Sequence, residues 1–380
     1  MTFKGSFTSR RPSRFVPALH SLLIALIILW LMPTACLQHH GVSPVPAEVR
    51  PDPVFNHLFT RSDHGWTGGD GTLSIALPDG RSLWLFGDSF LGHVRPDGSR
   101  PADTPLIRNC LVVQEGESLV TLHRGTRRDP MAFLTPEDPQ AWYWPGDGTV
   151  IGNRLHVFFH RFRQVSPGMW GWAWDGTVIA TLGLPGLGLE RVTPAEDDNG
   201  VAYGSALLEA ESWIYIYGTK PQGAIKQLHL ARAPKGNLLA PWQYWDGRHW
   251  SYDAGTTRSL LTGVSNQFGV LFLAKGIGLV TMDDRQPFSD RLVLYVAPEP
   301  TGPWQGPIAI YRAPEADGNL AAYNPFVHTQ FSHDNEALIS YNINHVHDPD
   351  RLYENADFYR PRFIRADLER LASENWKPDP

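Results

Sequence analysis

One pattern recurs along the chain: a short apolar run, a turn, and then a second run rich in aromatic or β-branched residues. The second runs of five such units begin about 55 to 75 residues apart, which is compatible with four strands and their loops per unit. They lie at residues 83–86, 155–159, 213–217, 270–273 and 337–341. Helical periodicity is nearly absent after Asp70, apart from a short stretch at 366–371. The repeat predicts an all-β protein, and specifically a five-bladed β-propeller.

Further runs are expected to complete each unit. Outer strands are predicted at 228–234 and 294–297, and residues 54–59 are predicted to supply the last outer strand and close the ring. A two-sheet sandwich would also explain the alternation within strands. It would not explain five repeats of a hairpin followed by outer strands.

In a propeller, the first strand of each blade lines a central channel and the second strand runs back beside it. The start of the first strand and the end of the second therefore emerge on the same face. Residues at the starts of first strands should then meet at the mouth of one funnel. They are Asp70, Asp147, Tyr203, Arg258 and Asn324.

The first hairpin is expected to bring two acidic residues together. Residues 77–81 contain a Pro-Asp-Gly turn between two β-prone runs. Folding the segment about Asp79 and Gly80 places Asp70 almost opposite Asp88. Two carboxylates held this close cannot both titrate normally, and enzymes obtain an acid and a base from such a pair. We interpret Asp70 and Asp88 as catalytic residues of a glycoside hydrolase; the alternatives are a turn aspartate and a strand-end cap.

Other side chains near strand starts are candidates for substrate binding. Asp147 repeats the Gly-Asp-Gly-Thr setting of Asp70 and is interpreted as a binding or pKa-tuning residue, with a plain turn as the alternative. Aromatic rings stack on the apolar faces of sugars, and arginines bind hydroxyls or orient carboxylates; core packing and structural ion pairs are the alternatives. The candidates are Trp66, Arg108, Asn109, Trp144, Asp147, Tyr203, Arg258, Tyr323, Asn324 and Arg360, with Trp142 and Tyr143 as further aromatic residues.

Composition excludes some classes of function. The net charge of −6, without a Lys/Arg cluster in the body of the chain, argues against nucleic acid as a partner. The spacing of His328, His345 and His347 fits no standard zinc site, so no metal or cofactor is expected. Cys110 lies in an apolar run and is interpreted as a buried strand residue that forms no disulfide.

The N-terminus is interpreted as an export signal. Residues 1–36 combine four basic residues, an apolar stretch at 19–32 and small residues before Cys36, which is typical of a bacterial lipoprotein signal with lipidation at that cysteine. An uncleaved membrane anchor is the alternative, but the apolar stretch is short for a span. Residues 37–53 are expected to form a tether, 54–372 the propeller domain and 373–380 a tail.

These motifs resemble a family of exported bacterial propellers first catalogued as domains of unknown function 4185 and 5005. Part of that group is classed as glycoside hydrolase family 183, the endo-D-arabinanases. The matching motifs are WTGGDGT at 66–72, WLFGDS at 84–89, RN at 108–109, ISYN at 339–342 and YRPRF at 359–363, and the resemblance covers residues 66–368. It implies a five-bladed propeller that cleaves furanosidic linkages with an acidic pair in its first blade, matched here by Asp70 and Asp88. Ser89 departs from the threonine of many relatives.

The expected function is therefore cleavage of furanosidic linkages in a polysaccharide, with arabinan as one candidate, by an exported, membrane-anchored monomer. Two other readings stay open. One is a non-catalytic propeller that binds glycan or protein. The other is a phosphate-ester or lactone hydrolase that depends on a central metal.

Overall fold

The structure is a computed structural model that describes residues 49–376 except 169, 196–198 and 287. These residues belong to one compact unit, Val42–Pro380. The predicted signal peptide, the lipidation at Cys36 and the tether before residue 49 lie outside the described residues. Within the described part, no helix has the length and apolarity needed to cross a membrane.

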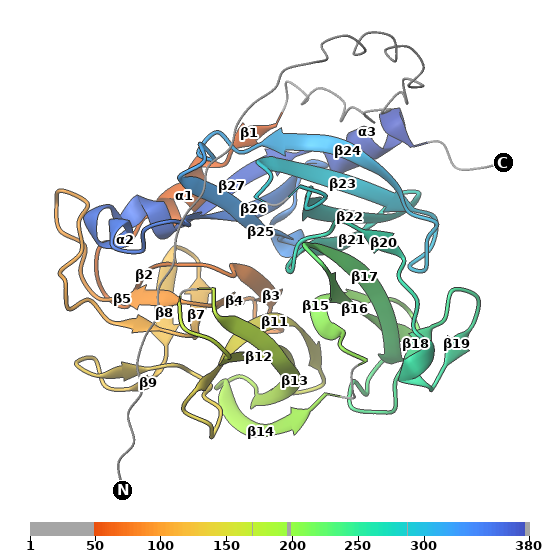
Figure 1. Ribbon diagram of the computed structural model, residues 1–380, viewed down its shortest axis with the longest axis horizontal. Helices are drawn as coiled ribbons and strands as arrows, with labels where there is room; N and C mark the ends of the chain where they lie inside the picture. Colours follow the sequence, from red (N-terminus) through yellow and green to blue (C-terminus); the bar gives the residue numbers. More distant parts are fainter. Residues whose placement is uncertain (1–48, 169, 196–198, 287, 377–380) are drawn as a thin grey trace, which may run out of the picture. The chain divides into compact units, whose positions relative to one another are not determined.

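Most of the described chain is β-structure, and five sheets contain at least four strands each (Figure 1). The first sheet comprises β3 (Leu73–Ala76), β4 (Ser82–Phe86), β7 (Cys110–Glu115) and β8 (Ser118–Leu122). The second comprises β11 (Ala141–Ile151), β12 (Arg154–Gln164), β13 (Trp172–Gly183) and β14 (Gly188–Pro194). The third comprises β15 (Ala202–Glu209), β16 (Trp213–Gln222), β17 (Ile225–Pro234), β18 (Gln243–Trp245), β19 (Trp250–Ser251) and β20 (Leu261–Thr262).

The fourth sheet comprises β21 (Gly269–Leu273), β22 (Gly276–Met282), β23 (Arg291–Ala297) and β24 (Gln305–Arg312). The fifth comprises β25 (Leu320–Val327), β26 (Ala337–His345), β27 (Pro361–Ala366) and β1 (Arg50–Pro51). Two smaller sheets contain β2 (Trp66–Gly69), β5 (Ser89–Leu91) and β6 (Leu106–Ile107), and β9 (Arg124–Gly125) with β10 (Pro130–Met131). The described α-helices are α1 (Pro53–Leu58), α2 (Arg351–Glu354) and α3 (Leu368–Asn375).

Each of the five sheets packs against the next in chain order. The first strands contact one another in the sequence β3, β11, β15, β21, β25. The fifth sheet returns to the first through a hydrogen bond of 2.8 Å from Asn342 Nδ2 to Thr72 Oγ1. The sheets therefore form a closed cycle, and they follow one another in this order in Figure 1.

The hydrophobic core is divided in the same way. Five clusters of buried side chains each lie between two consecutive sheets, the last one between the fifth sheet and the first. Trp84 of β4, for example, packs with Phe363 of β27 in the last cluster. Each sheet packs one face against the preceding sheet and the other face against the following sheet. Both faces are therefore buried, which explains why successive residues of these strands are apolar.

Two strand predictions are wrong. Residues 270–273 form the first strand of the fourth sheet, β21, and the second strand is β22. Both runs are apolar, so their pattern alone does not show which one faces the centre of the cycle. Residues 54–59 do not form the closing strand, because Pro53 and the capping carboxylate of Asp52 begin helix α1 there. The closing strand is β1, which lies within the segment assigned to the tether.

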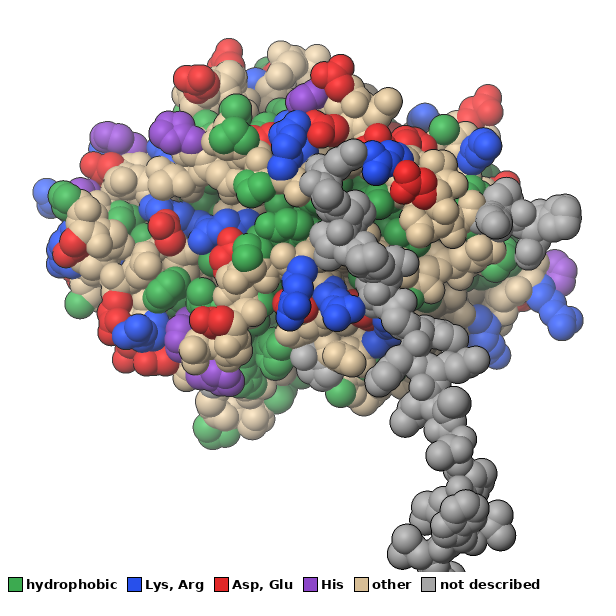
Figure 2. All heavy atoms as spheres, turned by 90° about the horizontal axis from the view of Figure 1, so that it is seen from above, with side chains coloured by type: hydrophobic (Ala, Val, Ile, Leu, Met, Phe, Trp, Pro, Cys, Tyr) green, Lys and Arg blue, Asp and Glu red, His purple; other side chains and the backbone are tan. Residues whose placement is uncertain are grey.

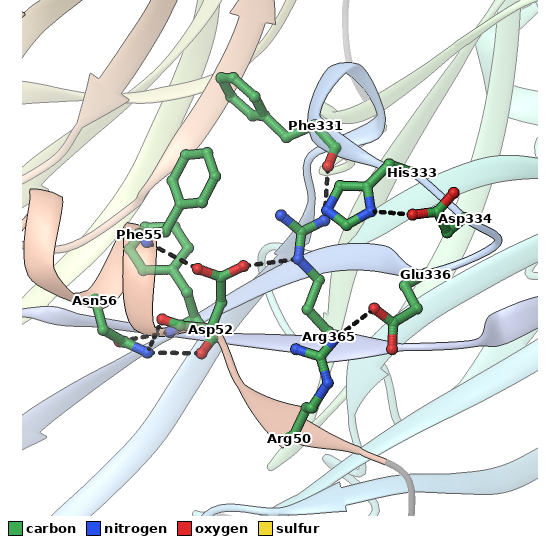
Figure 3. Close-up of polar contacts among 10 residues, drawn as sticks. Arg50, Asp52, Phe55, Asn56, Phe331, His333, Asp334, Glu336 and Arg365 are labelled. Atoms are coloured by element: carbon green, nitrogen blue, oxygen red, sulfur yellow. Dashed lines mark hydrogen bonds and ion pairs between the residues drawn. The ribbon is translucent and has the colours of Figure 1, made fainter. Parts of the chain in front are cut away.

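A buried ion pair holds β1 in place, and we call it the N-terminal clasp: Asp52 with Arg365. Asp52 Oδ2 accepts a hydrogen bond of 2.7 Å from Arg365 Nε, and both side chains are nearly excluded from solvent (Figure 3). Asp52 Oδ1 accepts from the backbone N of Phe55 at 2.8 Å, and Arg365 Nη1 donates to the carbonyl of Phe331 at 2.6 Å. The clasp therefore ties the N-terminal segment to β27 and to the segment that precedes β26.

The described surface in Figure 2 mixes the two signs of charge. Lys and Arg side chains alternate with Asp and Glu side chains over this face. Many of the charges are neutralised locally, as in the pair Arg81–Asp79 at 2.6 Å. Pairs that are this exposed contribute little to stability.

Candidate active site

The first hairpin has the predicted register. Strands β3 and β4 pair Leu73 with Leu85, and strands β2 and β5 continue the same register by pairing Gly69 with Ser89. Asp70 and Asp88 therefore lie opposite each other in the gap between the two strand pairs. The backbone N of Asp70 donates to the carbonyl of Asp88 at 3.2 Å. The prediction that one hairpin brings these two residues together is confirmed.

Both aspartates line a cavity of about 650 Å³. We use the name floor for the lining residues that lie at the bulges of β11, β15 and β25 or just before β3 and β21; other lining residues come from neighbouring strands, hairpins and loops. A volume of this size is in the range of pockets that hold small ligands. The residues at the floor are Asp70, Gly71, Pro145, Gly146, Ser205, Gln267, Tyr323 and Asn324.

The floor residues come from a local irregularity that recurs in the sheets. The pairing register shifts between Pro145 and Gly148 in β11, between Tyr203 and Ala206 in β15, and between Tyr323 and Phe326 in β25. Such bulges re-aim side chains and backbone toward one side of a strand. Gly71, Gly204 and Asn324 lie at corresponding places with positive φ, a conformation that glycine and asparagine tolerate best.

Asp70 is held in a setting that favours its protonated form. Burial and the nearby carboxylate of Asp88 raise its pKa to about 7. The hydroxyl of Tyr323 donates to Asp70 Oδ2 at 2.8 Å, and this bond and the hydroxyl of Tyr359 oppose the shift. Gly87 makes room for the carboxylate, because a Cβ at this position would lie 2.6 Å from Asp70 Oδ1.

Asp88 has two hydrogen-bond donors that favour its charged form. Arg108 Nη1 donates to Oδ2 at 2.8 Å, and Trp144 Nε1 donates to Oδ1 at 2.8 Å. Burial raises the pKa of Asp88, while Arg108 and Trp144 act in the opposite direction. When the two carboxyl groups share one proton, these donors favour the negative charge on Asp88 and leave the proton on Asp70.

We expect Asp70→Asn to raise the free energy of unfolding at pH 8 by about 2–4 kcal/mol and to change it little at pH 4. The pKa of Asp70 is about 7 in the folded protein, against 3.8 for an ordinary aspartate. Between these values the unfolded chain has lost the proton and the folded chain still binds it, so stability falls as pH rises. The amide removes this penalty. Urea unfolding at the two pH values measures the effect, and a variant no more stable than the parent at pH 8 would contradict it.

The cavity has an aromatic side and a polar side. We call the aromatic side the aromatic wall, and it is formed by Trp142, Trp144, Phe162 and Trp172 of the second sheet. The ring centroids of Trp144 and Phe162 are 4.6 Å apart, and those of Trp144 and Trp172 are 5.2 Å apart. The polar side carries Ser265, Asn266, Gln267, Lys226 and Asp284, which come from the third and fourth sheets and the segments that join them.

The structure brings some of the predicted binding residues to the cavity and places others elsewhere. Arg108, Trp144, Tyr323 and Asn324 line the cavity, as does Trp142. Trp66 is buried beside Phe86 with 4.5 Å between the ring centroids. Tyr203 packs against Trp242 in the core between the second and third sheets.

Polar candidates off the cavity make structural hydrogen bonds. Asn109 Nδ2 donates to the carbonyls of Leu134 and Tyr143, at 2.8 and 2.9 Å. Arg360 Nε donates to the carbonyl of Thr67 at 3.1 Å. Arg258 lies between β19 and β20 of the third sheet, where its Nη1 donates to the carbonyl of Thr257 at 3.2 Å. The segment just before the fourth sheet supplies Gln267 to the floor of the cavity, and Arg258 does not line the cavity.

Asp147 resembles Asp70 in sequence and burial but not in direction. Burial raises its pKa to about 7 as well. Its Oδ2 accepts from the backbone N of Leu207 in β15 at 2.8 Å, so the carboxyl group links the second sheet to the third. Asp147 is absent from the cavity lining, where its neighbours Pro145 and Gly146 lie. Its setting is that of a structural residue.

A family model described as "Domain of unknown function (DUF5005)" matches residues 52–376. The chain belongs to this family. The match includes the hairpin with both aspartates and all five large sheets, apart from β1. No curated protein sequence matches the chain.

Solved structures add information on the fold. A crystal structure described as a "putative hydrolase" from Bacteroides ovatus ATCC 8483 is 25% identical, with a TM-score of 0.76 over 87% of this chain and 93% of that one. The two proteins therefore share a fold. The α-L-arabinofuranosidase PaAbf62A from Podospora anserina is 9% identical with a TM-score of 0.46, over 80% of this chain and 91% of that one. The GH43_1 enzyme from Xanthomonas citri is 11% identical with a TM-score of 0.46, over 84% and 89%.

Several cavity residues were not predicted from the sequence of this DUF5005 chain. Tyr359 belongs to the YRPRF motif, but sequence reasoning chose its neighbour Arg360 from that motif. Lys226 and Asp284 lie far apart in the chain and carry no local signal, yet they form an ion pair of 3.1 Å at the cavity. Trp170 and Phe288 lie in loops, where a lone aromatic residue predicts nothing specific.

Among the described residues, no group of three or more His, Cys, Asp or Glu side chains is placed to hold a metal ion. His328 is fully buried, with hydrogen bonds between its ring nitrogens and the hydroxyls of Ser74 (2.6 Å) and Ser340 (2.9 Å). It lies between the first and fifth sheets. Its burial and these two hydrogen bonds indicate a structural role for His328.

Proposed function

We propose that the protein is a five-bladed β-propeller glycoside hydrolase in which Asp70 and Asp88 are the catalytic carboxyl groups. The closed cycle of five large sheets, with one core cluster between each pair of neighbours, supports this number of blades. The smaller sheet of β2, β5 and β6 then extends the first blade beyond the catalytic hairpin.

One observation carries the catalytic proposal: two facing carboxyl groups at the floor of one cavity have different hydrogen-bond partners. Asp70, whose pKa is about 7, acts as the general acid that protonates the leaving oxygen. Asp88 is the ionised partner, because Arg108 and Trp144 donate to it. It acts as nucleophile in a retaining reaction or as base toward water in an inverting one.

The lining supports a neutral sugar as substrate. A sugar ring has an apolar face that stacks on aromatic side chains and hydroxyls that bond to polar groups. The aromatic wall offers the first kind of surface, and the side chains of Ser265, Asn266 and Gln267 on the polar side offer the second. The family resemblance of the sequence motifs points to furanosidic linkages as the bonds that are cleaved. Arabinan is therefore the first polymer to test. A hydrolase description for the Bacteroides ovatus structure agrees with this class of reaction.

We further propose that the protein is exported and held at the membrane by a lipid on Cys36, as its N-terminal sequence predicts. The aspartate-lined cavity would then face polysaccharides outside the cytoplasm. Metabolic labelling with a fatty-acid analogue, compared between the wild type and Cys36→Ser, tests the anchor.

The function is tested by incubating the purified protein with arabinans and related cell-wall glycans and analysing the products. We expect shortened chains, and the anomeric form of the first product, followed by NMR, distinguishes retention from inversion. Binding without any cleavage would favour the non-catalytic alternative. Activity that is lost with a chelator and restored by a metal ion would favour the metal-dependent alternative.

We expect Tyr323→Phe to move the alkaline limb of the pH–rate profile upward by about one pH unit. The acid form of Asp70 is lost above its pKa of about 7, so the rate of the wild type should fall there. Tyr323 stabilises the ionised form through a bond of 2.8 Å, and its loss raises the pKa further. Tyr341→Phe is the matched control, because Tyr341 Oη donates to Glu315, away from the cavity. An alkaline limb that stays in place or moves downward would count against the assignment.

A further inference from the structure

Two exposed aromatic side chains meet at the cavity. Trp170 lies in the loop between β12 and β13, and Phe288 lies in the loop between β22 and β23. Their relative exposures are 57% and 62%, and both line the cavity. Their ring centroids are 6.3 Å apart with an interplanar angle of 64°. The aromatic wall, by contrast, is formed by side chains that pack against one another along the second sheet.

The position of this rim pair, Trp170 with Phe288, is set by the cyclic order of the sheets. Trp170 belongs to the second sheet and Phe288 to the fourth, and the third sheet lies between these two in the cycle. Contact between the two loops therefore spans the side of the cavity above the third sheet. Phe288 has a φ of 56°, which is unusual for a large side chain.

A charged pair completes this side of the cavity. Asp284 lies in the same loop as Phe288 and pairs with Lys226 of β17 at 3.1 Å. Both side chains are largely shielded from solvent and both line the cavity. The bond uses one of three ammonium protons and one carboxylate oxygen, so both groups retain capacity for further hydrogen bonds. The pair is neutral as a unit, which favours hydroxyl groups over an anion as ligand.

We propose that the rim pair and the Lys226–Asp284 pair form a second sugar-binding subsite, separate from the carboxyl pair, for a neutral sugar ring of a glycan chain. The aromatic faces stack on the apolar face of the ring, and the charged pair bonds its hydroxyls. This inference rests on the proposed function and deepens it. It makes the protein specific for glycan chains in which one sugar lies at the carboxyl pair and another lies at the rim pair.

The experiment compares polymer and monomer substrates. Trp170→Ala and Asp284→Asn should each raise KM for an arabinan by about tenfold, which corresponds to about 1.4 kcal/mol. The same variants should change kcat/KM for a 4-nitrophenyl arabinofuranoside by less than twofold. Tyr252→Ala is the matched control, since Tyr252 is 68% exposed and absent from the cavity lining. An unchanged KM for the polymer, or an equal loss on both substrates, would overturn the subsite.

A binding measurement separates the subsite from catalysis. In the Asp70→Asn background, titration with the same arabinan should quench tryptophan fluorescence, and adding Trp170→Ala should weaken the affinity about tenfold. Binding that depends on Trp170 without hydrolysis by the parent protein would support the subsite and refute the hydrolase. Hydrolysis that does not depend on Trp170 would support the hydrolase and refute the subsite. Absence of both binding and hydrolysis across the glycans would refute both.

Discussion

Replacing Asp70 or Asp88 by Asn is expected to lower the rate of glycan hydrolysis by at least about 10³-fold while the protein remains folded. Asn cannot donate a proton to the leaving oxygen in place of Asp70, and it cannot carry the charge that Arg108 and Trp144 favour on Asp88. The double variant should be little worse than either single variant, because the two groups act as a unit. Initial rates on the arabinan that the wild type cleaves measure the effect.

The chain contains a closely matched control for this experiment. Asp147 has the same Gly-Asp-Gly-Thr setting as Asp70 and the same pKa of about 7, but it is directed to Leu207 and not to the cavity. Asp147→Asn should therefore keep the rate within about tenfold of the wild type, provided that circular dichroism shows a folded protein. Equal losses in Asp70→Asn and Asp147→Asn would mean that the loss reflects a disturbed fold, and full activity in both catalytic variants would exclude the proposed pair.

Asp52→Ala is expected to lower the free energy of unfolding by about 3–5 kcal/mol, the largest effect on stability that we predict. The substitution leaves the guanidinium of Arg365 buried without its carboxylate partner and removes the cap of helix α1. It also loosens β1, the outermost strand of the fifth sheet. Urea unfolding followed by tryptophan fluorescence measures the loss.

Two further variants separate burial from charge. In Asp52→Leu combined with Arg365→Met, no buried charge is left unpaired, so much of the stability should return. Glu336→Gln breaks the exposed pair with Arg50, which also joins β1 to the fifth sheet, and should cost less than about 1 kcal/mol. A double variant as unstable as Asp52→Ala would show that the clasp stabilises the protein through packing and not through charge.

Local sequence information was sufficient for most of the strands and for the hairpin that carries Asp70 and Asp88. A Pro-Asp-Gly turn sets the register of the residues on either side, so the pairing of Asp70 with Asp88 follows from counting along two strands. Cys110 is a fully buried strand residue, as its apolar neighbours predict. These features depend on residues close together in the chain, whose geometry is limited by backbone sterics and by period-two alternation.

The rest of the site was decided by tertiary structure. Asp147 and Asp70 share a local sequence, yet a bulge in β11 and the neighbouring β15 turn the carboxyl group of Asp147 away from the cavity. Tyr323, Tyr359 and Asp284 reach the cavity from other sheets or from the segments between their strands. Which sheets become neighbours depends on packing across the whole cycle, and the sequence near Asp70 carries no information about a partner 253 residues away, Tyr323.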